Sequence, residues 1–404
     1  MSEQTKLKRV LNLPLLIFYG VGVTIGAGIF ALIGETIGIA GNNAPIAFLI
    51  AGIIAAATGL SYAKLAAVYP RAAGEAVFVN IGIGPNWGRF VGLAVTATAI
   101  ISSAVISLSF AGYLGQLINL PQPLFVAGII VFLTIIASLG VTHSIVFAAI
   151  ITAIEISALI LIIWVGGDKL ISLSNWQAAF SPPSDLAQWS AISSAAILAF
   201  FAFVGFEDIE NMAEETINPH VNVPRAIIGT LIITVIVYAL VALIAVSAQD
   251  QNAIASSQAP LATLYAQLTG SNGDLIATAA SIAMINGVLV QIVMASRVMF
   301  GMAKEGLLPE IFSRVHPQRQ TPIIATIVVA SLTALLAFTF PLGGLARATS
   351  VIILSVFTLV NFSLWRIGSR VDAHKSLVRW RWLGLVGAAI SAALIVIEIG
   401  LQLT

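Results

Sequence analysis

Long apolar segments recur along this chain and constrain its fold more than any other feature. A helix needs about 20 apolar residues to cross the hydrocarbon core of a bilayer. About eleven segments reach that length. They are 14–38, 44–67, 90–118, 123–142, 145–166, 190–213, 224–247, 274–303, 322–340, 345–366 and 379–401. Only 9% of the 404 residues are charged, against about a quarter in soluble domains. The sequence predicts an all-α integral membrane protein with about 11 transmembrane helices in a lipid bilayer.

Lysine and arginine are distributed very unevenly over the segments that connect these helices. If the N-terminus lies in the cytoplasm, all 18 fall on the inner side except Lys169 and Arg347. Cytoplasmic loops of membrane proteins carry the excess of Lys and Arg. The pattern predicts a multi-pass protein of the cell (plasma) membrane with a cytoplasmic N-terminus. The outer loops 167–189 and 248–273 are expected to carry short interfacial helices or lids.

The remaining composition argues against several classes of function. A formal net charge of +1 does not supply the excess of positive charge that is typical of nucleic-acid-binding proteins. The chain has no cysteine, and its four histidines are scattered without metal-binding spacing, so neither a metal site nor another cofactor is expected. No Ser/His/Asp set or phosphate-binding loop is visible, which disfavours a membrane enzyme.

The first apolar segment contains a stretch that is poorly suited to a continuous helix. Residues 20–30 read GVGVTIGAGIF, with glycines at 20, 22, 26 and 28. Each glycine in a helix interior lowers the stability of the helix by roughly 1 kcal/mol relative to alanine. In lipid, a broken helix is tolerated only where protein, water or a ligand satisfies its freed backbone groups. We expect this interruption to be a binding site.

The sixth apolar segment contains a second weak point. Residues 200–215 read FFAFVGFEDIENMAEE, with Gly205 near the middle and the acids Glu207 and Asp208 directly after it. Because this segment starts five segments after the first, the two would cross the membrane in opposite directions. Interrupted helices at matching positions of inverted halves indicate a transporter site. A glycine used only for helix packing is the alternative.

The direction of the helices predicts the chemistry of that site. The outer half of the first helix would begin near Ala27–Phe30 and direct free N–H groups toward the midplane, where a carboxylate is favoured. The carbonyls around Thr24–Gly26 and Phe201–Val204 would suit an ammonium group. One zwitterion satisfies both ends, and an α-amino acid has that form.

These motifs resemble those of a known family. GVTIGAGIF resembles the first-helix motif of the amino acid–polyamine–organocation (APC) superfamily, and three further segments agree with it, namely 62–79, 205–227 and 296–312. The resemblance implies an amino acid permease with a LeuT-type 5+5 inverted repeat, broken helices 1 and 6, and alternating access. The expected parts are a cytoplasmic segment 1–13, a first five-helix repeat 14–166, an outer loop 167–189, a second, inverted repeat 190–366, and a cytoplasmic loop with an extra helix 367–404.

The resemblance also implies roles for single residues. Gly26, Ala27 and Gly28 would hold the substrate carboxylate through backbone N–H groups. The site would be lined from the sixth helix by Phe201, Val204 and Gly205 and from the eighth by Gln291. Phe201 takes the position of an aromatic gate, although ordinary core packing would also explain it. Gln291, like the neighbouring Asn286, could instead bridge helices.

Three of the glutamates within the apolar segments need separate explanations, because a buried carboxylate costs several kcal/mol unless it is paired, protonated or hydrated. Glu207 is expected to be a proton-sensitive gating group or a structural cap. Glu155 stands where some relatives place a lysine, and it is either a proton-coupling group or a structural partner of a hydroxyl or amide. Glu398 is expected to lie near the outer interface in contact with water.

The side chains expected around the substrate are apolar, namely Ile25, Ala27, Phe201, Phe203 and Val204. The sequence therefore predicts a secondary transporter of amino acids, neutral ones favoured, driven by proton coupling or by exchange. A cationic amino acid or polyamine exchanger and a non-transporting amino acid sensor are the alternatives. Substrate identity, coupling ion and oligomeric state are not determined by these patterns.

Overall fold

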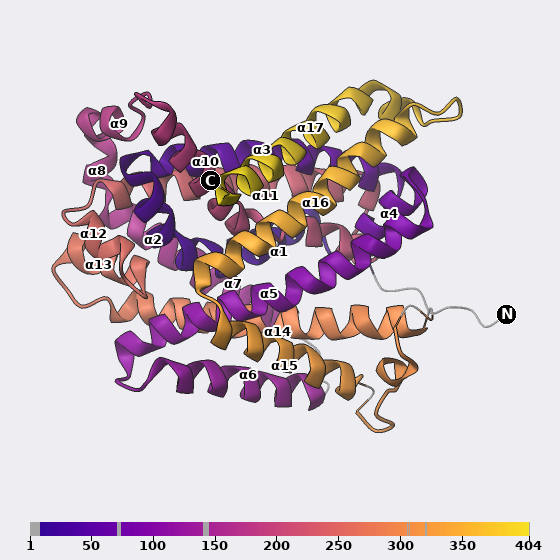
Figure 1. The fold of residues 1–404 in the computed structure, drawn as a ribbon, viewed down its shortest axis with the longest axis horizontal. Coiled ribbons are helices and arrows are strands. Elements are labelled where there is room, and N and C mark those ends of the chain that lie inside the picture. The colour runs from indigo at the N-terminus through magenta and orange to yellow at the C-terminus, as the bar shows by residue number, and fades with distance from the viewer. Residues whose placement is uncertain are drawn as a thin grey trace.

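The computed structural model describes residues 9–70, 74–139, 145–304, 306, 308–319 and 321–403. Within these residues every regular element is a helix, apart from one isolated parallel bridge between Leu11 and Thr216. The long helices pack side by side in a single bundle (Figure 1). This architecture confirms the predicted all-helical fold class.

The helices coincide with the predicted apolar segments. The first part of the chain forms α1 (Leu13–Ile25), α2 (Gly28–Ala40), η1 (Gly41–Asn43), α3 (Ala44–Val68), α4 (Gly74–Gly82), α5 (Pro85–Leu117), α6 (Gln122–Leu139), α7 (Ile145–Val165), α8 (Gly167–Ile171) and α9 (Leu173–Ala179). The second part forms α10 (Leu186–Phe200), η2 (Phe201–Phe203), η3 (Phe206–Glu215), α11 (Pro219–Val246), α12 (Gln251–Ala255), α13 (Pro260–Thr269), α14 (Asp274–Lys304), η4 (Glu310–Ser313), α15 (Ile323–Thr339), α16 (Leu342–Gly368) and α17 (Lys375–Leu403).

Within the described residues, eight helical stretches are long and apolar enough to cross a membrane by length and composition. Three shorter apolar helices, Leu13–Ile25, Ala149–Val165 and Ile323–Thr339, add to them. The exact number of crossings stays a prediction. The long α5 runs obliquely across the bundle (Figure 1), as expected for a helix of 33 residues that must fit a bilayer.

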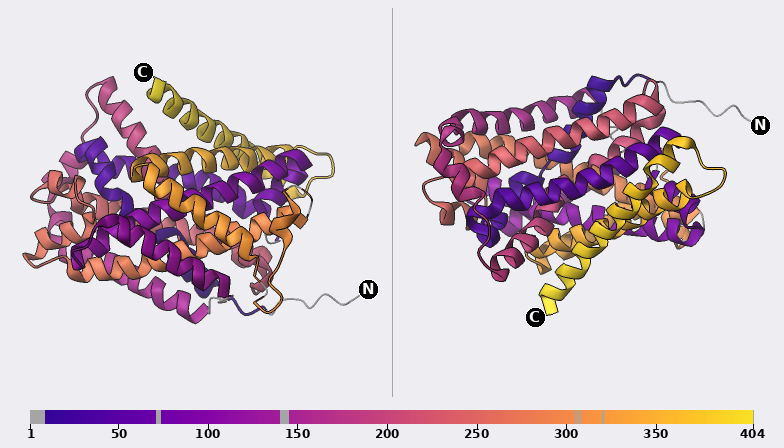
Figure 2. Two further views of the ribbon diagram at one scale, coloured as in Figure 1. Left: turned by 60° about the horizontal axis from the view of Figure 1, so that its bottom comes forward. Right: turned by 90° about the horizontal axis from the view of Figure 1, so that it is seen from above.

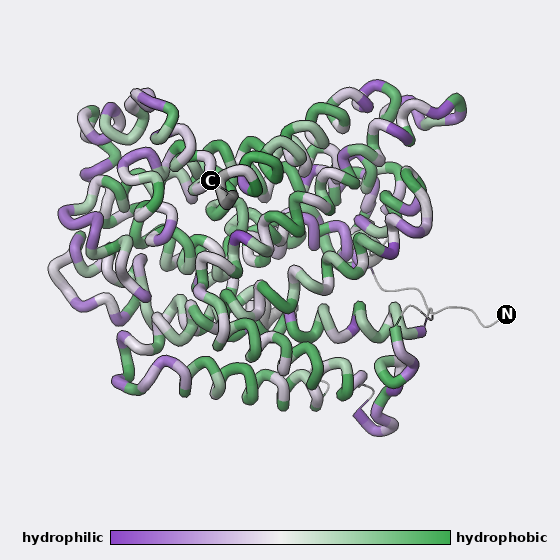
Figure 3. The backbone as a smooth tube through the Cα atoms, in the orientation of Figure 1, coloured by the Kyte–Doolittle hydropathy of each residue, from purple (hydrophilic) through white to green (hydrophobic). Residues whose placement is uncertain are grey.

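Polar residues gather at the two ends of the bundle, whereas its middle is mainly hydrophobic (Figure 3). One end carries α8, α9, α12 and α13, and the other carries α4 and the turn between α16 and α17 (Figure 1). The two predicted outer loops therefore lie at the same end and contain short helices, as expected. Two further views place α17 along one edge of the bundle (Figure 2), where it packs on α16 and α3.

The first membrane helix is interrupted where its glycines predicted. The N-terminal part, α1, ends at Ile25, and Gly26 adopts φ 28° and ψ −137°. The C-terminal part, α2, begins at Gly28. Only glycine enters such a positive-φ conformation readily, so Gly26 makes the break. Gly20 and Gly22 remain helical and instead allow close contacts with Ile209 and Thr152.

The sixth membrane helix is interrupted as well. The α-helix α10 ends at Phe200, and one 3₁₀ turn, η2, carries the chain to an extended Val204. Gly205 then adopts φ 124°. The continuation, η3, is a ten-residue 3₁₀ helix rather than an α-helix. Both predicted breaks are thus present.

The expectation for Glu398 is wrong. Glu398 is 1% exposed, and its Oε1 atom lies 3.2 Å from Nη1 of Arg347 on α16. The same Nη1 donates to Oγ of Ser194 on α10 at 2.9 Å. Burial of a carboxylate is tolerated here because a guanidinium from another helix neutralises it. This contact joins α17 to α16 and α10.

Removal of this pair should loosen the attachment of α17. In Glu398→Gln, Arg347 loses its counter-charge while still partly buried, so we expect a loss of roughly 1–3 kcal/mol of stability. Thermal unfolding of the purified protein in detergent measures it. Asp372→Asn removes the same charge from an exposed position and should leave the melting temperature unchanged. Equal melting temperatures for the two variants would contradict a stabilising role.

Candidate functional site

The two helix breaks meet in the middle of the bundle. A Cβ atom on Gly28 would lie 2.5 Å from the Cα atom of Ala202, and one on Gly205 would lie 2.8 Å from the carbonyl oxygen of Val23. The backbones of both breaks are therefore in direct contact, and η2 packs against α1 and α2. Glycine is required at both positions because any side chain would separate the two segments. The structure thus brings the predicted segments 25–28 and 201–205 together.

Free amide groups point out of the N-terminal end of α2. Its first internal hydrogen bond runs from Ala31 N to Ala27 O, so the N–H groups of Gly28, Ile29 and Phe30 have no acceptor within the helix. No side chain caps this end. Uncapped amides and the positive end of the helix dipole together favour an anionic group.

Carbonyl groups from the other two helix ends converge on one hydroxyl. Tyr238 on α11 places its Oη atom 2.8 Å from Ala202 O, 3.1 Å from Thr24 O and 3.3 Å from Ile25 O. A phenol has a single hydrogen and can satisfy only one of the three acceptors at a time. The remaining acceptor capacity would suit an ammonium group or another donor.

Tyr238 was missed by the sequence reasoning. The only signal was a single tyrosine in the middle of the apolar run TVIVYALVALIAV, which the pattern alone would assign to ordinary packing. Its ring is held edge-to-face by Phe48 and Phe203, with centroid separations of 5.9 and 5.1 Å. Phe203, which was expected to line the site, supports Tyr238 through this contact.

The other predicted lining residues are mostly buried around the breaks. Ile25, Ala27 and Phe201 are 1%, 5% and 5% exposed. Val204 is half-buried. All four side chains are apolar, so the described surroundings of the breaks offer backbone polarity and little side-chain polarity.

Glu207 follows the break in the sixth helix. Its Oε2 atom accepts a hydrogen bond from Gly205 N at 2.8 Å, and the residue is 5% exposed. This bond ties the carboxyl to the backbone of the break and agrees with the capping interpretation. It leaves the gating interpretation open, since a gate can use the same contact.

Glu155 lies in α7, next to the first break. Thr152, one turn earlier on the same helix, is packed against Gly22. Glu155 is 3% exposed, and its Oε2 atom has no hydrogen-bond partner. A buried carboxyl thus lies on a helix that packs against α1, without a cation beside it among the described ion pairs.

The predicted contribution of Gln291 is not established by the contacts of the structure. Its Oε1 atom is buried without a partner, as is Oδ1 of Asn286 on the same helix, α14. Two unsatisfied amide oxygens in one membrane helix agree with a polar function, but no contact joins them to the breaks. The role of Gln291 at the substrate stays a prediction.

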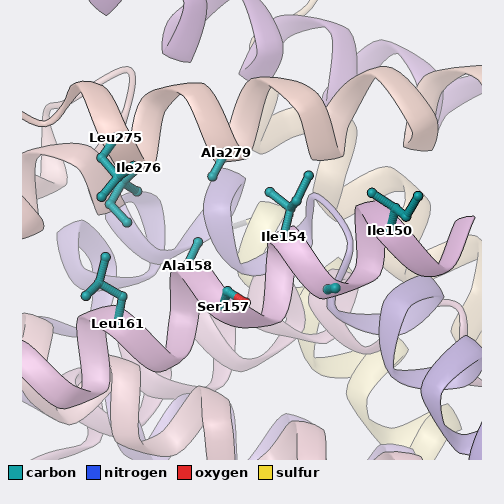
Figure 4. Close-up of a pocket in the computed structure, with 9 residues that line it drawn as sticks. Ile150, Ile154, Ser157, Ala158, Leu161, Leu275, Ile276 and Ala279 are labelled. Carbon is teal, nitrogen blue, oxygen red and sulfur yellow. The ribbon is translucent and has the colours of Figure 1, made fainter. Parts of the chain in front are cut away.

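Two hollows in the described structure lie away from the breaks. One, of about 410 Å³, is an apolar groove between α7 and α14 (Figure 4), lined by residues such as Ile154, Ala158 and Ala279. The other, of about 390 Å³, lies beside Glu35 of α2 and residues 255–258. Neither hollow is lined by a residue of the two breaks. The breaks themselves are in direct contact with each other.

Comparisons with known proteins agree on one family. A family model described as "Amino acid permease" matches residues 11–402. The chain is similar to the branched-chain amino acid permease BcaP of Bacillus subtilis, 30% identical over 386 residues, 90% of this chain and 82% of that protein. It is also similar to the vacuolar cationic amino acid transporter 4 of Arabidopsis thaliana, 29% identical over 85% of this chain and 61% of that protein. Human cationic amino acid transporter 4 is 28% identical over 90% of this chain and 60% of that protein.

Loss of the Tyr238 hydroxyl should weaken the junction of the two breaks. In Tyr238→Phe the converging carbonyls lose their donor in dry surroundings, so we expect a loss of about 1–3 kcal/mol. The drop in apparent melting temperature in detergent measures this loss. The half-buried Tyr265 of α13 provides the control Tyr265→Phe, which should change little. An unaltered melting temperature for Tyr238→Phe would show that the junction does not need this hydroxyl.

Proposed function

This chain belongs to the amino acid permease family of the APC superfamily, and we propose that it is a secondary transporter that carries amino acids by alternating access. Members of this family are multi-pass membrane transporters and not enzymes. The proposal places this chain in the plasma membrane with a cytoplasmic N-terminus. It divides the helices into the inverted repeats 14–166 and 190–366, with the two breaks at corresponding positions.

One observation carries the proposal, namely the opposed polarity of the backbone at the two breaks. Uncapped N–H groups begin α2, while carbonyls of Thr24, Ile25 and Ala202 converge beside Tyr238. A free α-amino acid carries a carboxylate and an ammonium group on neighbouring atoms, so it complements both sets. Because the breaks are in contact in this structure, entry of the substrate requires α2 and η2 to separate. Such a separation fits a transport cycle in which the site opens and closes.

Neutral amino acids are the substrates that the site favours. Ile25, Ala27, Phe201 and Val204 present apolar side chains, and a cationic side chain would need a fixed carboxylate at its far end. Cationic amino acids are the second candidate, because similar proteins carry that name and buried carboxyls lie nearby at Glu155 and Glu207. Backbone contacts cannot distinguish the two classes, since all amino acids share the groups that they bind.

Glu207 and Glu155 are the candidates for proton coupling. Each is buried, and each lies beside one break, so a change of charge would act directly on the backbone that holds the substrate. Exchange of one amino acid for another needs no such group and is the alternative mode. Phe201, at the end of the outer part of the sixth helix, is the proposed aromatic gate.

Counterflow in proteoliposomes tests the function and the close approach of the breaks together. We expect labelled leucine to enter vesicles that contain unlabelled leucine, and arginine to compete weakly. Gly28→Ala should lower the rate roughly tenfold to a hundredfold, since overpacking costs about 1–3 kcal/mol. Gly128→Ala, where an added Cβ meets no atom within 4 Å, is the matched control. If no amino acid enters in any format, the proposed function is wrong.

The pH dependence of uptake tests Glu207. The substitution Glu207→Gln keeps an oxygen that can accept the Gly205 N–H bond, and it removes the titratable charge. If Glu207 couples protons, uptake driven by a pH gradient should disappear, while exchange at equal pH continues. Glu310→Gln, at an exposed position, should retain both activities. A Glu207→Gln protein with the wild-type pH profile would leave only the capping role.

A further inference from the structure

Two buried glutamates, neither of which belongs to the substrate site, meet where α4 packs near η3. Glu75, at the start of α4, is 6% exposed, and Glu210, in η3, is 1% exposed. The carboxyl group of Glu210 lies directly over Gly74, so close that Gly74 has no room for a side chain. The carboxyl of Glu210 is therefore held against the first residue of α4.

These two carboxyl groups interact in a way that requires a proton. Glu75 follows Gly74 directly in α4, so the Glu210 carboxyl lies against the residue next to Glu75, and both glutamates are buried there. Ionised carboxylates are acceptors only, so two of them cannot hydrogen-bond to each other. A proton on either carboxyl turns this repulsive contact into a hydrogen bond.

A third polar group without a partner points to the same place. Tyr62 of α3 is fully buried, and its hydroxyl has no hydrogen-bond partner. Its ring lies edge-to-face against Phe78 of α4 and Phe206 of η3, at 6.1 and 5.8 Å between centroids. Tyr62 therefore sits between the two elements that the glutamates join.

No described cation neutralises this cluster. The described ion pairs are Lys169–Asp168 and Arg347–Glu398, both elsewhere. Charged or titratable groups on the elements packed against α4 and η3, in the described part of the chain, include Glu207, Asp208 and Glu215 of η3, Lys64 of α3, Arg89 of α5, His220 and Arg225 of α11, and Arg366 and Arg370 of α16. Lys64 lies over the ring of Trp380, His220 and the four arginines are exposed, and Arg370 donates to Ile81 O at the far end of α4.

A metal ion is a poor substitute for the proton. The described residues contain no group of three or more His, Cys, Asp or Glu side chains placed to hold a metal. Burial raises the pKa of the Glu75 carboxyl, which lies in α4 outside the membrane-spanning helices. The neutral form of Glu75 is therefore favoured as long as the cluster stays dry.

We propose that Glu75 and Glu210 form a proton-binding site that holds α4 against the inner part of the sixth helix. The proposal rests on the proposed transport function, because η3 continues directly from the break that would bind the substrate. Binding takes one proton from water onto the carboxylate pair, and opening returns it. When the proton leaves, two like charges face each other in dry surroundings, and α4 separates from η3. Closure at this end of the bundle is thereby linked to proton uptake.

Distance measurements on the full-length protein test this site without any transport assay. The chain has no cysteine, so spin labels can be attached at Asn80→Cys and Ile217→Cys, both exposed positions. At acidic pH we expect one short distance between labels. As the pH rises, a longer distance should appear, with the ratio of open to closed protein rising by up to about tenfold per pH unit.

Three variants separate the site from its neighbours. The double variant Glu75→Gln and Glu210→Gln keeps hydrogen-bonding capacity without charge and should retain the short distance at every pH. Glu210→Gln alone should do the same, which guards against a double variant that fails to fold. Glu310→Gln, at an exposed position of η4, should retain the wild-type response.

Two outcomes would overturn the proposal. One is a pH response in both Glu210 variants equal to that of the wild type. The other is recovery of the short distance at alkaline pH on addition of Mg²⁺ or Ca²⁺ alone, which would assign the site to a metal. These distances are measured without substrate, so their outcome does not depend on whether amino acid counterflow occurs. Failure of this proposal can therefore be told apart from failure of the proposed transport function.

Discussion

Backbone groups freed at the two helix breaks must find partners inside the protein, because lipid offers none. The rest of the structure depends on how they do so. Gly28 and Gly205 allow the two breaks to touch, the Tyr238 hydroxyl lies among three carbonyls, and the Glu207 carboxyl accepts the N–H of Gly205. The amides at the start of α2 remain without a side-chain cap. That unmet need is what a substrate carboxylate can satisfy.

The buried acids of the molecule fall into two groups that differ in how their charge is tolerated. Glu398 is neutralised by Arg347 and joins three helices. Glu155, Glu75, Glu207 and Glu210 are buried without such a partner among the described ion pairs. A carboxyl in that position must carry a proton, meet water or meet a ligand at some stage. The first group therefore stabilises the fold, and the second suits a protein that changes conformation.

Much of the architecture follows from local patterns. Apolar length predicted the helices, and glycines that weaken a helix interior predicted both breaks, because these signals depend on neighbouring residues only. The expected solvation of Glu398 failed for the opposite reason, since its partner lies 51 residues away in the chain. Tyr238 bonds to residues 214, 213 and 36 positions away, and nothing in its own segment distinguishes it from a packing aromatic.

The sequence by itself determined a membrane protein of apolar helices, two of them broken, and a backbone polarity that suits a zwitterion. These features are set by composition and by the conformational freedom of single glycines. Only the tertiary structure decided which groups meet: the Tyr238 hydroxyl with the carbonyls of both breaks, Glu398 with Arg347, and the Glu210 carboxyl with the start of α4 at Gly74. Such contacts join distant parts of the chain, and burial then fixes how each polar group must be satisfied. Local sequence does not encode that information.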